Sequence, residues 1–121
     1  MLSPDPDAVL ARLRAICLAL PQAEEIVSHG APAFRVGKMF AWFRHDHHGD
    51  GLTVVCVKTT GREEQEFLVE VDPETYSRPA YLWPSGWVSI NLAGGAVDWD
   101  HVAARVQTSW RMAAPAKLSS P

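Results

Sequence analysis

Apolar residues near the start of the chain recur at three- and four-residue spacing, which is the periodicity of a helix with one buried face. The pattern predicts a helix over residues 5–20. Asp5 followed by Pro6 forms a suitable N-terminal cap, and Ser3 followed by Pro4 is an alternative start. A helix with a single apolar stripe needs a second layer on which to pack.

Two later segments have the same helical periodicity. Residues 62–70 are rich in helix formers and follow Thr60, which with Glu63 has the spacing of a capping box. The apolar stripe of this second helix comprises Phe67, Leu68 and Val71. The last helix begins after Asp98, and its apolar face comprises Trp99, Val102, Ala103, Val106 and Trp110.

Between the first two helices the pattern changes to short runs of β-branched and aromatic residues, separated by glycine, proline and polar turns. Four strands are predicted within residues 25–58, with a tight turn at Gly37 and Lys38 and a polar loop at 45–51. Strict alternation divides the side chains of the third strand between two faces: Met39, Ala41 and Phe43 on one, Phe40 and Trp42 on the other. Because both faces are apolar, this strand is expected near the centre of the sheet.

A loop over residues 78–86 and a strand over 87–92 complete the order αββββαβα, which defines an α+β fold with helices packed on an antiparallel sheet. The 121 residues, 47% of them hydrophobic, suit a single domain, assigned to residues 1–118 with a polar tail at 119–121. No apolar run reaches the roughly 20 residues that span a bilayer, and the acidic start lacks the basic segment of a signal peptide. A cytoplasmic protein without a membrane partner is therefore expected.

Charge is unevenly distributed along the chain. Fourteen acids and eleven bases give a net charge of −3 and a pI near 5.9, which argues against strong, delocalised binding to nucleic acid. Residues 35–62 nevertheless carry five bases and two acids, whereas residues 63–74 carry six acids and no base. The fold decides whether these stretches form separate basic and acidic surfaces.

Seven short segments occur in a distinctive order. They are Leu20-Pro21, Glu24-Glu25, residues 28–41 (SHGAPAFRVGKMFA), Arg78-Pro79-Ala80-Tyr81-Leu82, Gly86-Trp87-Val88, Val97-Asp98-Trp99-Asp100 and Ala114-Pro115-Ala116-Lys117-Leu118. Together they resemble the MmcQ/YjbR family over nearly the whole chain. The resemblance implies a CyaY-like α+β fold, also described as a double wing, and a bacterial protein of a kind commonly labelled DNA-binding. It implies no catalytic activity. The chain departs from the family's pattern in having one glycine before Lys38 and Trp83-Pro84-Ser85 in place of a more glycine-rich turn.

Basic and aromatic residues of the hairpin and the long loop form a candidate nucleic-acid site, because cations contact phosphates and exposed rings stack on bases. The candidate residues are Arg35, Lys38, Lys58, Arg78, Tyr81 and Trp87. Arg35 and Lys38 flank the turn at Gly37, where a hairpin wing can protrude into a groove of DNA. The alternative is that the rings pack in the core or under loops and that the cations are simply solvated.

Ser28 and His29 lie in a segment whose backbone Gly30 and Pro32 restrict. Histidine is suited to proton transfer near neutral pH, so His29 can act as an acid, a base or a phosphate donor, with Ser28 as its nucleophile. Neighbouring side chains in a strand point to opposite faces, so contact between these two requires a turn, and a structural role is the alternative. The corresponding pocket hypothesis combines Ser28, His29, Arg78 and Tyr81.

No metal or cofactor site is predicted. The polar loop concentrates possible ligands (His45, Asp46, His47, His48 and Asp50), but their spacing matches no closed metal site and suits a hydrophilic loop. Cys17 and Cys56 lie 39 positions apart in apolar surroundings. This arrangement favours buried thiols over a redox pair or a nucleophile.

These observations lead to one leading hypothesis and two alternatives. The leading hypothesis is a non-enzymatic cytoplasmic protein that binds nucleic acid, DNA in particular, weakly through the basic hairpin and loop. The first alternative is a small-molecule or phosphate-metabolite binding domain, which includes an uncharacterised enzyme. The second is an adaptor that contacts protein through exposed aromatic residues. The sequence contains no recognisable catalytic constellation, and it leaves the oligomeric state open.

Overall fold

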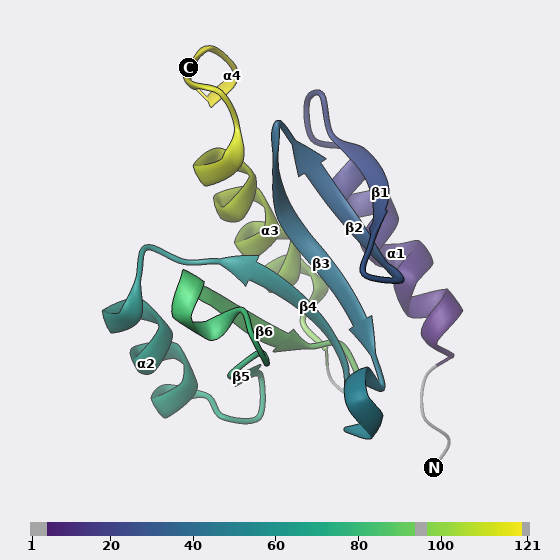
Figure 1. Cartoon of the computed structure of the whole chain (residues 1–121), viewed down its shortest axis with the longest axis vertical. Coiled ribbons are helices and arrows are strands. Elements are labelled where there is room, and N and C mark those ends of the chain that lie inside the picture. Colours follow the sequence, from purple (N-terminus) through teal and green to yellow (C-terminus); the bar gives the residue numbers. More distant parts are fainter. Residues whose placement is uncertain (1–4, 94–96, 120–121) are drawn as a thin grey trace.

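A six-stranded antiparallel sheet, in the strand order β1-β2-β3-β4-β6-β5, organises the chain (Figure 1). This computed structural model describes residues 5–93 and 97–119, so the alternative cap at Ser3 and Pro4 and residues 120–121 of the predicted tail lie outside the described part. The strands are β1 (Glu24–Ser28), β2 (Ala31–Val36), β3 (Lys38–His45), β4 (Thr53–Lys58), β5 (Tyr76–Ser77) and β6 (Trp87–Asn91). β3 lies near the middle of the sheet, as its two apolar faces predict.

Two long helices cover one face of the sheet. α1 (Pro6–Leu18) and α3 (Trp99–Ala113) lie behind it in Figure 1, while α2 (Arg62–Val71) packs beside the edge strand β5. The remaining elements are the short helix α4 (Ala116–Ser119) and two 3-10 turns, η1 (His47–Gly49) and η2 (Trp83–Ser85). None of the described helices has the length and apolar character to cross a membrane. The α+β class is confirmed, with the two-residue β5 as an addition to the predicted order.

The main core lies between the sheet and α1 and α3. Its fully buried side chains come from both layers and include Leu13, Cys17, Phe34, Phe40, Val55, Val57, Val88, Ile90, Val102 and Val106. The predicted cap of the first helix is confirmed, because the Asp5 carboxylate accepts the Asp7 N–H at 3.0 Å. The predicted apolar face of α3 is also confirmed, with Trp99 and Ala103 half-buried and its other members buried.

A β-bulge changes the facing of β3. The register between β2 and β3 shifts next to Phe34, which places one extra residue in β3. Phe40 and Ala41 consequently both face the main core, whereas Met39 and Trp42 face the opposite side. The strict alternation predicted for this strand is therefore wrong, because a bulge interrupts the two-residue period of the side chains.

The hydroxyl of Ser109, on α3, links β3 to β4 just beyond the last paired residues of these two strands. This side chain is completely buried; its Oγ donates to the Phe40 carbonyl at 2.5 Å and accepts the Lys58 N–H at 2.9 Å. Without these two bonds, a carbonyl and an amide would be left unpaired inside the fold. One serine thus couples the last long helix to two central strands.

α2 begins differently from the prediction. Thr60 donates both its N–H and its hydroxyl to Glu64, at 2.8 and 3.3 Å, rather than forming a capping box with Glu63. Gly61 is the N-cap residue, at a φ of 143° that side chains rarely adopt. The predicted capping box is wrong because this glycine lets the chain turn one residue later.

The predicted apolar stripe of α2 is also largely wrong. Phe67 and Val71 are 61% and 59% exposed, and only Leu68 packs against the core. The buried residue of this helix is Gln65, which is 1% exposed. Because α2 lies beyond the sheet edge and not on its face, a polar side chain with backbone partners fills the contact position.

We expect Ser109→Ala to lower the free energy of unfolding by about 2 kcal/mol, because it strands two buried backbone groups. The measurement is urea unfolding followed by circular dichroism. Thr108→Ala is the matched control, since the Thr108 hydroxyl bonds only the Ala104 carbonyl of its own helix. Equal stabilities of the two variants would contradict the proposed coupling of α3 to β3 and β4.

Candidate functional site

The second face of the sheet, opposite α1 and α3, is here called the open face. Its apolar patch comprises Ala33, Trp42, Val54, Cys56 and Trp87, with Leu82 of the 78–86 loop packed against it. Cations lie over the two indole rings: the Arg44 guanidinium is 5.0 Å from the Trp42 ring centre, and Lys58 Nζ is 5.7 Å from that of Trp87. The aliphatic stems and charges of these side chains take the place of a second helical layer.

Buried hydrogen bonds hold the 78–86 loop against the open face. The Gln65 side-chain amide donates to the carbonyls of Trp83 and Trp87, both at 2.8 Å, and Arg44 Nη1 donates to the Ala80 carbonyl at 3.0 Å. Between these anchors, Tyr81 adopts a left-handed backbone conformation with a φ of 67° and is 78% exposed. The loop therefore presents a tyrosine ring to solvent from a fixed base.

Lys38 and Lys58, both predicted site residues, lie close enough to influence each other. Burial and the charge of Lys38 lower the pKa of Lys58 from its ordinary value. Arg35 differs, because its Nε is 2.5 Å from Glu24 Oε1 on the neighbouring strand. The two lysines thus form a basic pair, whereas the charge of Arg35 is matched by an acid.

The turn between β2 and β3 lies against the C-terminal segment and does not form a separate protruding wing. Gly37 has a φ of 82°, and a Cβ built on it would lie 3.8 Å from Pro115 Cδ. Pro115 and Lys117 instead form one wall of a shallow cleft of about 410 Å³ beside this turn. The hairpin is therefore part of a continuous surface with the C-terminal segment.

The remaining predicted nucleic-acid residues have different settings. Arg78 is exposed, and its guanidinium lies 4.8 Å from the Trp83 ring centre, three residues from Tyr81. Trp87 is only 6% exposed and lies beneath Lys58. Arg78 and the exposed Tyr81 therefore lie on the same loop, whereas the Trp87 ring is part of the apolar patch.

Ser28 and His29 meet at the β1–β2 turn. His29 has a φ of 51°, and its Nδ1 lies 3.2 Å from Ser28 Oγ, so a turn does bring the two side chains together. The imidazole ring also packs 5.5 Å from the Trp42 ring. Neither residue lines any of the three cavities described in this subsection, whereas Arg78 lines one of them.

That cavity, here called the Arg44 cavity, lies between the open face and the start of the 78–86 loop and has a volume of about 40 Å³. Its polar lining residues are Arg44, His47, Asp50, Ser77, Arg78 and Ser89. Arg44 is 7% exposed, and no carboxylate of the described residues forms an ion pair with it. Sequence reasoning passed over this arginine, although a charge inside the apolar strand Lys38–His45 was a signal for it.

Both cysteines are buried and free, as predicted. Burial raises the pKa of each thiol, so both are protonated at neutral pH. Cys56 Sγ lies 3.6 Å from Ser89 Oγ, beside the Arg44 cavity. A neutral thiol adds no negative charge beside this cavity.

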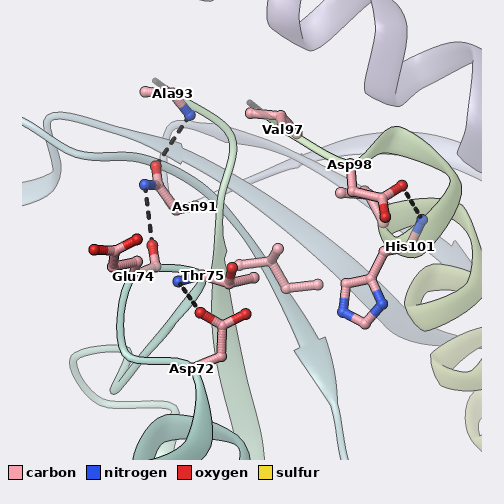
Figure 2. Close-up of a pocket in the computed structure, with 10 residues that line it drawn as sticks. Asp72, Glu74, Thr75, Asn91, Ala93, Val97, Asp98 and His101 are labelled. Carbon is pink, nitrogen blue, oxygen red and sulfur yellow. Dashed lines mark hydrogen bonds between the residues drawn. The ribbon is translucent and has the colours of Figure 1, made fainter. Parts of the chain in front are cut away.

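A larger cleft of about 460 Å³ lies elsewhere, between the end of α2 and the start of α3. Figure 2 shows that its carboxylates serve the backbone: Asp98 accepts the His101 N–H that begins α3, and Asp72 accepts the Thr75 N–H. Glu74 adds a third acid, and none of the predicted site residues lines the cleft. Within residues 5–93 and 97–119, no group of His, Cys, Asp or Glu side chains is arranged to hold a metal ion. This acidic cleft is unsuited to phosphate.

Comparison with known proteins establishes the family. The family model described as YjbR matches residues 18–112, and the chain therefore belongs to the YjbR family, which confirms the resemblance seen in the sequence. Among solved structures, the Deinococcus radiodurans protein DR2400, described as a DUF419 domain, is similar with a TM-score of 0.69. It shares 23% identity, over 85% of this chain and 76% of that chain, and so supports the fold. No curated protein matches the chain.

We expect Gln65→Leu to release the 78–86 loop, because the two carbonyls that anchor it lose their buried donor. Chymotrypsin should then cleave after Tyr81 at least about threefold faster, since the free energy of local opening falls by about 1 kcal/mol or more. The measurement is mass spectrometry of timed digests. Gln107→Leu, at an exposed position of α3, is the matched control, and an unchanged cleavage rate in Gln65→Leu would contradict this anchoring role.

Proposed function

We propose that this protein is a non-enzymatic binding protein that holds single-stranded nucleic acid, DNA in particular, weakly on the open face. One observation carries the proposal: Lys38, Lys58 and Arg78 form no ion pair among the described residues, although the chain has a net charge of −3. Acids pair with other arginines, such as Arg14 and Arg105. Cations left unpaired in an acidic chain suit a ligand that brings its own negative charge.

A single strand fits this surface better than a duplex. The exposed ring of Tyr81 offers a face on which an unpaired base can stack, and Arg78, three residues earlier on the same loop, supplies a cation. Groove insertion would need a protruding wing, and the turn at Gly37 lies beside Pro115 instead. Three phosphate contacts and one stacked base correspond to weak binding that depends on salt.

We expect the double variant Lys38→Ala, Lys58→Ala to weaken binding to all single-stranded sequences and to reduce the salt slope by about 1.4, or about 0.7 for each phosphate that is no longer neutralised. The measurement is fluorescence anisotropy with single- and double-stranded DNA and RNA from low to physiological salt. The double variant Arg12→Ala, Arg111→Ala removes the same charge from the two helices of the opposite face. Equal losses of affinity in the two double variants would show that binding depends only on the net charge of the protein and would contradict a site on the open face. Absence of salt-dependent binding in the unmodified protein would also contradict the proposal.

We expect Tyr81→Asn to weaken single-strand binding about tenfold, because one stacked base contributes about 1–3 kcal/mol. Asparagine tolerates the left-handed backbone at this position, so the loop keeps its shape. Tyr81→Phe is the matched control, since it retains the ring. If Tyr81→Phe weakens binding as much as Tyr81→Asn, the tyrosine contributes through its hydroxyl and not through stacking.

A further inference from the structure

We infer that the Arg44 cavity is a binding site for one terminal phosphate group, a phosphate monoester. The inference goes beyond the proposed function, because the site takes this group whether a strand or a small molecule carries it. It rests on a buried, unpaired guanidinium, on the hydroxyls beside it and on the size of the cavity. Each of these features has its own structural basis.

The first feature is the buried charge of Arg44. Removing a guanidinium from water is costly unless an anion or several acceptors replace the lost hydration. Arg44 is 7% exposed, yet its contacts are one hydrogen bond to the Ala80 carbonyl and the ring of Trp42. A guanidinium has five N–H donors in a planar fork, so it retains donors for an oxyanion, which it binds in bidentate geometry.

The second feature is a set of neutral donors next to this arginine. Ser77 and Ser89 are directly paired across β5 and β6, so their side chains lie on the same face of the sheet, and both line the cavity. Ser89 is 3% exposed, and the side-chain neighbour of its hydroxyl is the protonated thiol of Cys56. Hydroxyls in this setting donate to phosphate oxygens without adding charge.

The net charge of the residues that line the cavity favours an anion of low charge. Arg44 and Arg78 contribute +2, and Asp50 contributes −1, which leaves +1. The Asp50 carboxylate is already used in part, because Oδ1 accepts the Leu52 N–H at 2.8 Å. Its negative charge at the rim opposes a dianion, so removing that charge should strengthen phosphate binding.

The volume of the cavity limits what enters it. About 40 Å³ holds a few water molecules or one oxyanion, and it excludes a sugar or a base. The rest of the ligand must therefore remain outside. Exposed Arg78 and Tyr81 lie on the same loop, where they are available to the ester group of the ligand. The site thus recognises the phosphate end of its ligand.

The experiment is a titration of the protein with ethyl phosphate, followed by the ¹H–¹⁵N signals of the arginine Nε–H groups. We expect the Arg44 signal to shift saturably, with the dissociation constant raised about tenfold by Arg78→Ala and lowered at least about twofold by Asp50→Asn. Arg12→Ala, on the opposite face, should leave it unchanged. An Arg44 signal that does not move, or equal dissociation constants for the unmodified protein, Arg78→Ala and Asp50→Asn, would overturn the inference.

Arg44→Gln is a direct test but removes a buried anchor of the loop, so Ser89→Ala serves as the milder second variant. Ser89→Ala should weaken ethyl phosphate binding about threefold while the thermal midpoint changes little. Unchanged affinity in a folded Ser89→Ala protein would remove Ser89 from the site and count against the inference.

Two oligonucleotides distinguish the sources of the phosphate. If the terminus of a strand is bound, a 5′-phosphorylated single strand should bind about tenfold more tightly than its 5′-hydroxyl counterpart, and Arg78→Ala should abolish that difference. If a free phosphomonoester is bound, the two strands should bind equally while ethyl phosphate still shifts Arg44. The double variant Lys38→Ala, Lys58→Ala should keep ethyl phosphate binding, which separates failure of this site from failure of strand binding.

Discussion

The structure depends on a sheet that has long helices on one face only. α1 and α3 bury the apolar side of the six strands, whereas the other side retains tryptophan rings that no long helix covers. Arg44 and Lys58 lie over two of these rings, so long cationic side chains shield the apolar surface. The shielding by Arg44 and Lys58 also changes the charge of the open face. The groups that protect the open face also make it basic, in a chain whose overall charge is negative.

Polar residues at buried positions determine the shape of that face. Gln65 and Arg44 hold the 78–86 loop through hydrogen bonds to backbone carbonyls in and next to it, and Ser109 links β3 to β4. Such groups are directional, and each fixes a partner at one distance and angle, whereas apolar packing tolerates small shifts. α2 illustrates the cost of this arrangement. Its buried glutamine positions the loop, whereas Phe67 and Val71 remain at the surface.

The charge blocks of the sequence are partly separated in space. The acidic residues of the stretch 63–74 lie along α2 and in the turn after it. Two of them, Asp72 and Glu74, line the cleft at the start of α3 (Figure 2). The bases of residues 35–62 lie mainly on or beside the open face, but acids pair with some of them, including Arg35 and Arg62. Among the unpaired cations of the described residues, Lys38 and Lys58 are close enough for the charge of one to lower the pKa of the other, which counts of charge along the chain do not reveal.

Local patterns in the sequence were sufficient for the helices of the main core, the strands and the α+β class. Periodicity and capping depend on neighbouring residues, and the Asp5 cap and the buried face of α3 follow from them. The late cap at Gly61 is a local feature, in which Thr60 bonds Glu64 and not the Glu63 that the spacing favoured. The bulge in β3 and the exposed stripe of α2 were not predictable, because each depends on contacts with distant segments. The same holds for the Arg44 cavity: β3 and the η1 turn that follows it are far in sequence from the β5–β6 pair, and only tertiary packing brings two arginines and two serines together. Tertiary packing also places Trp87 under a lysine and leaves Tyr81 exposed to solvent, since burial is a property of the assembled layers and not of a residue type.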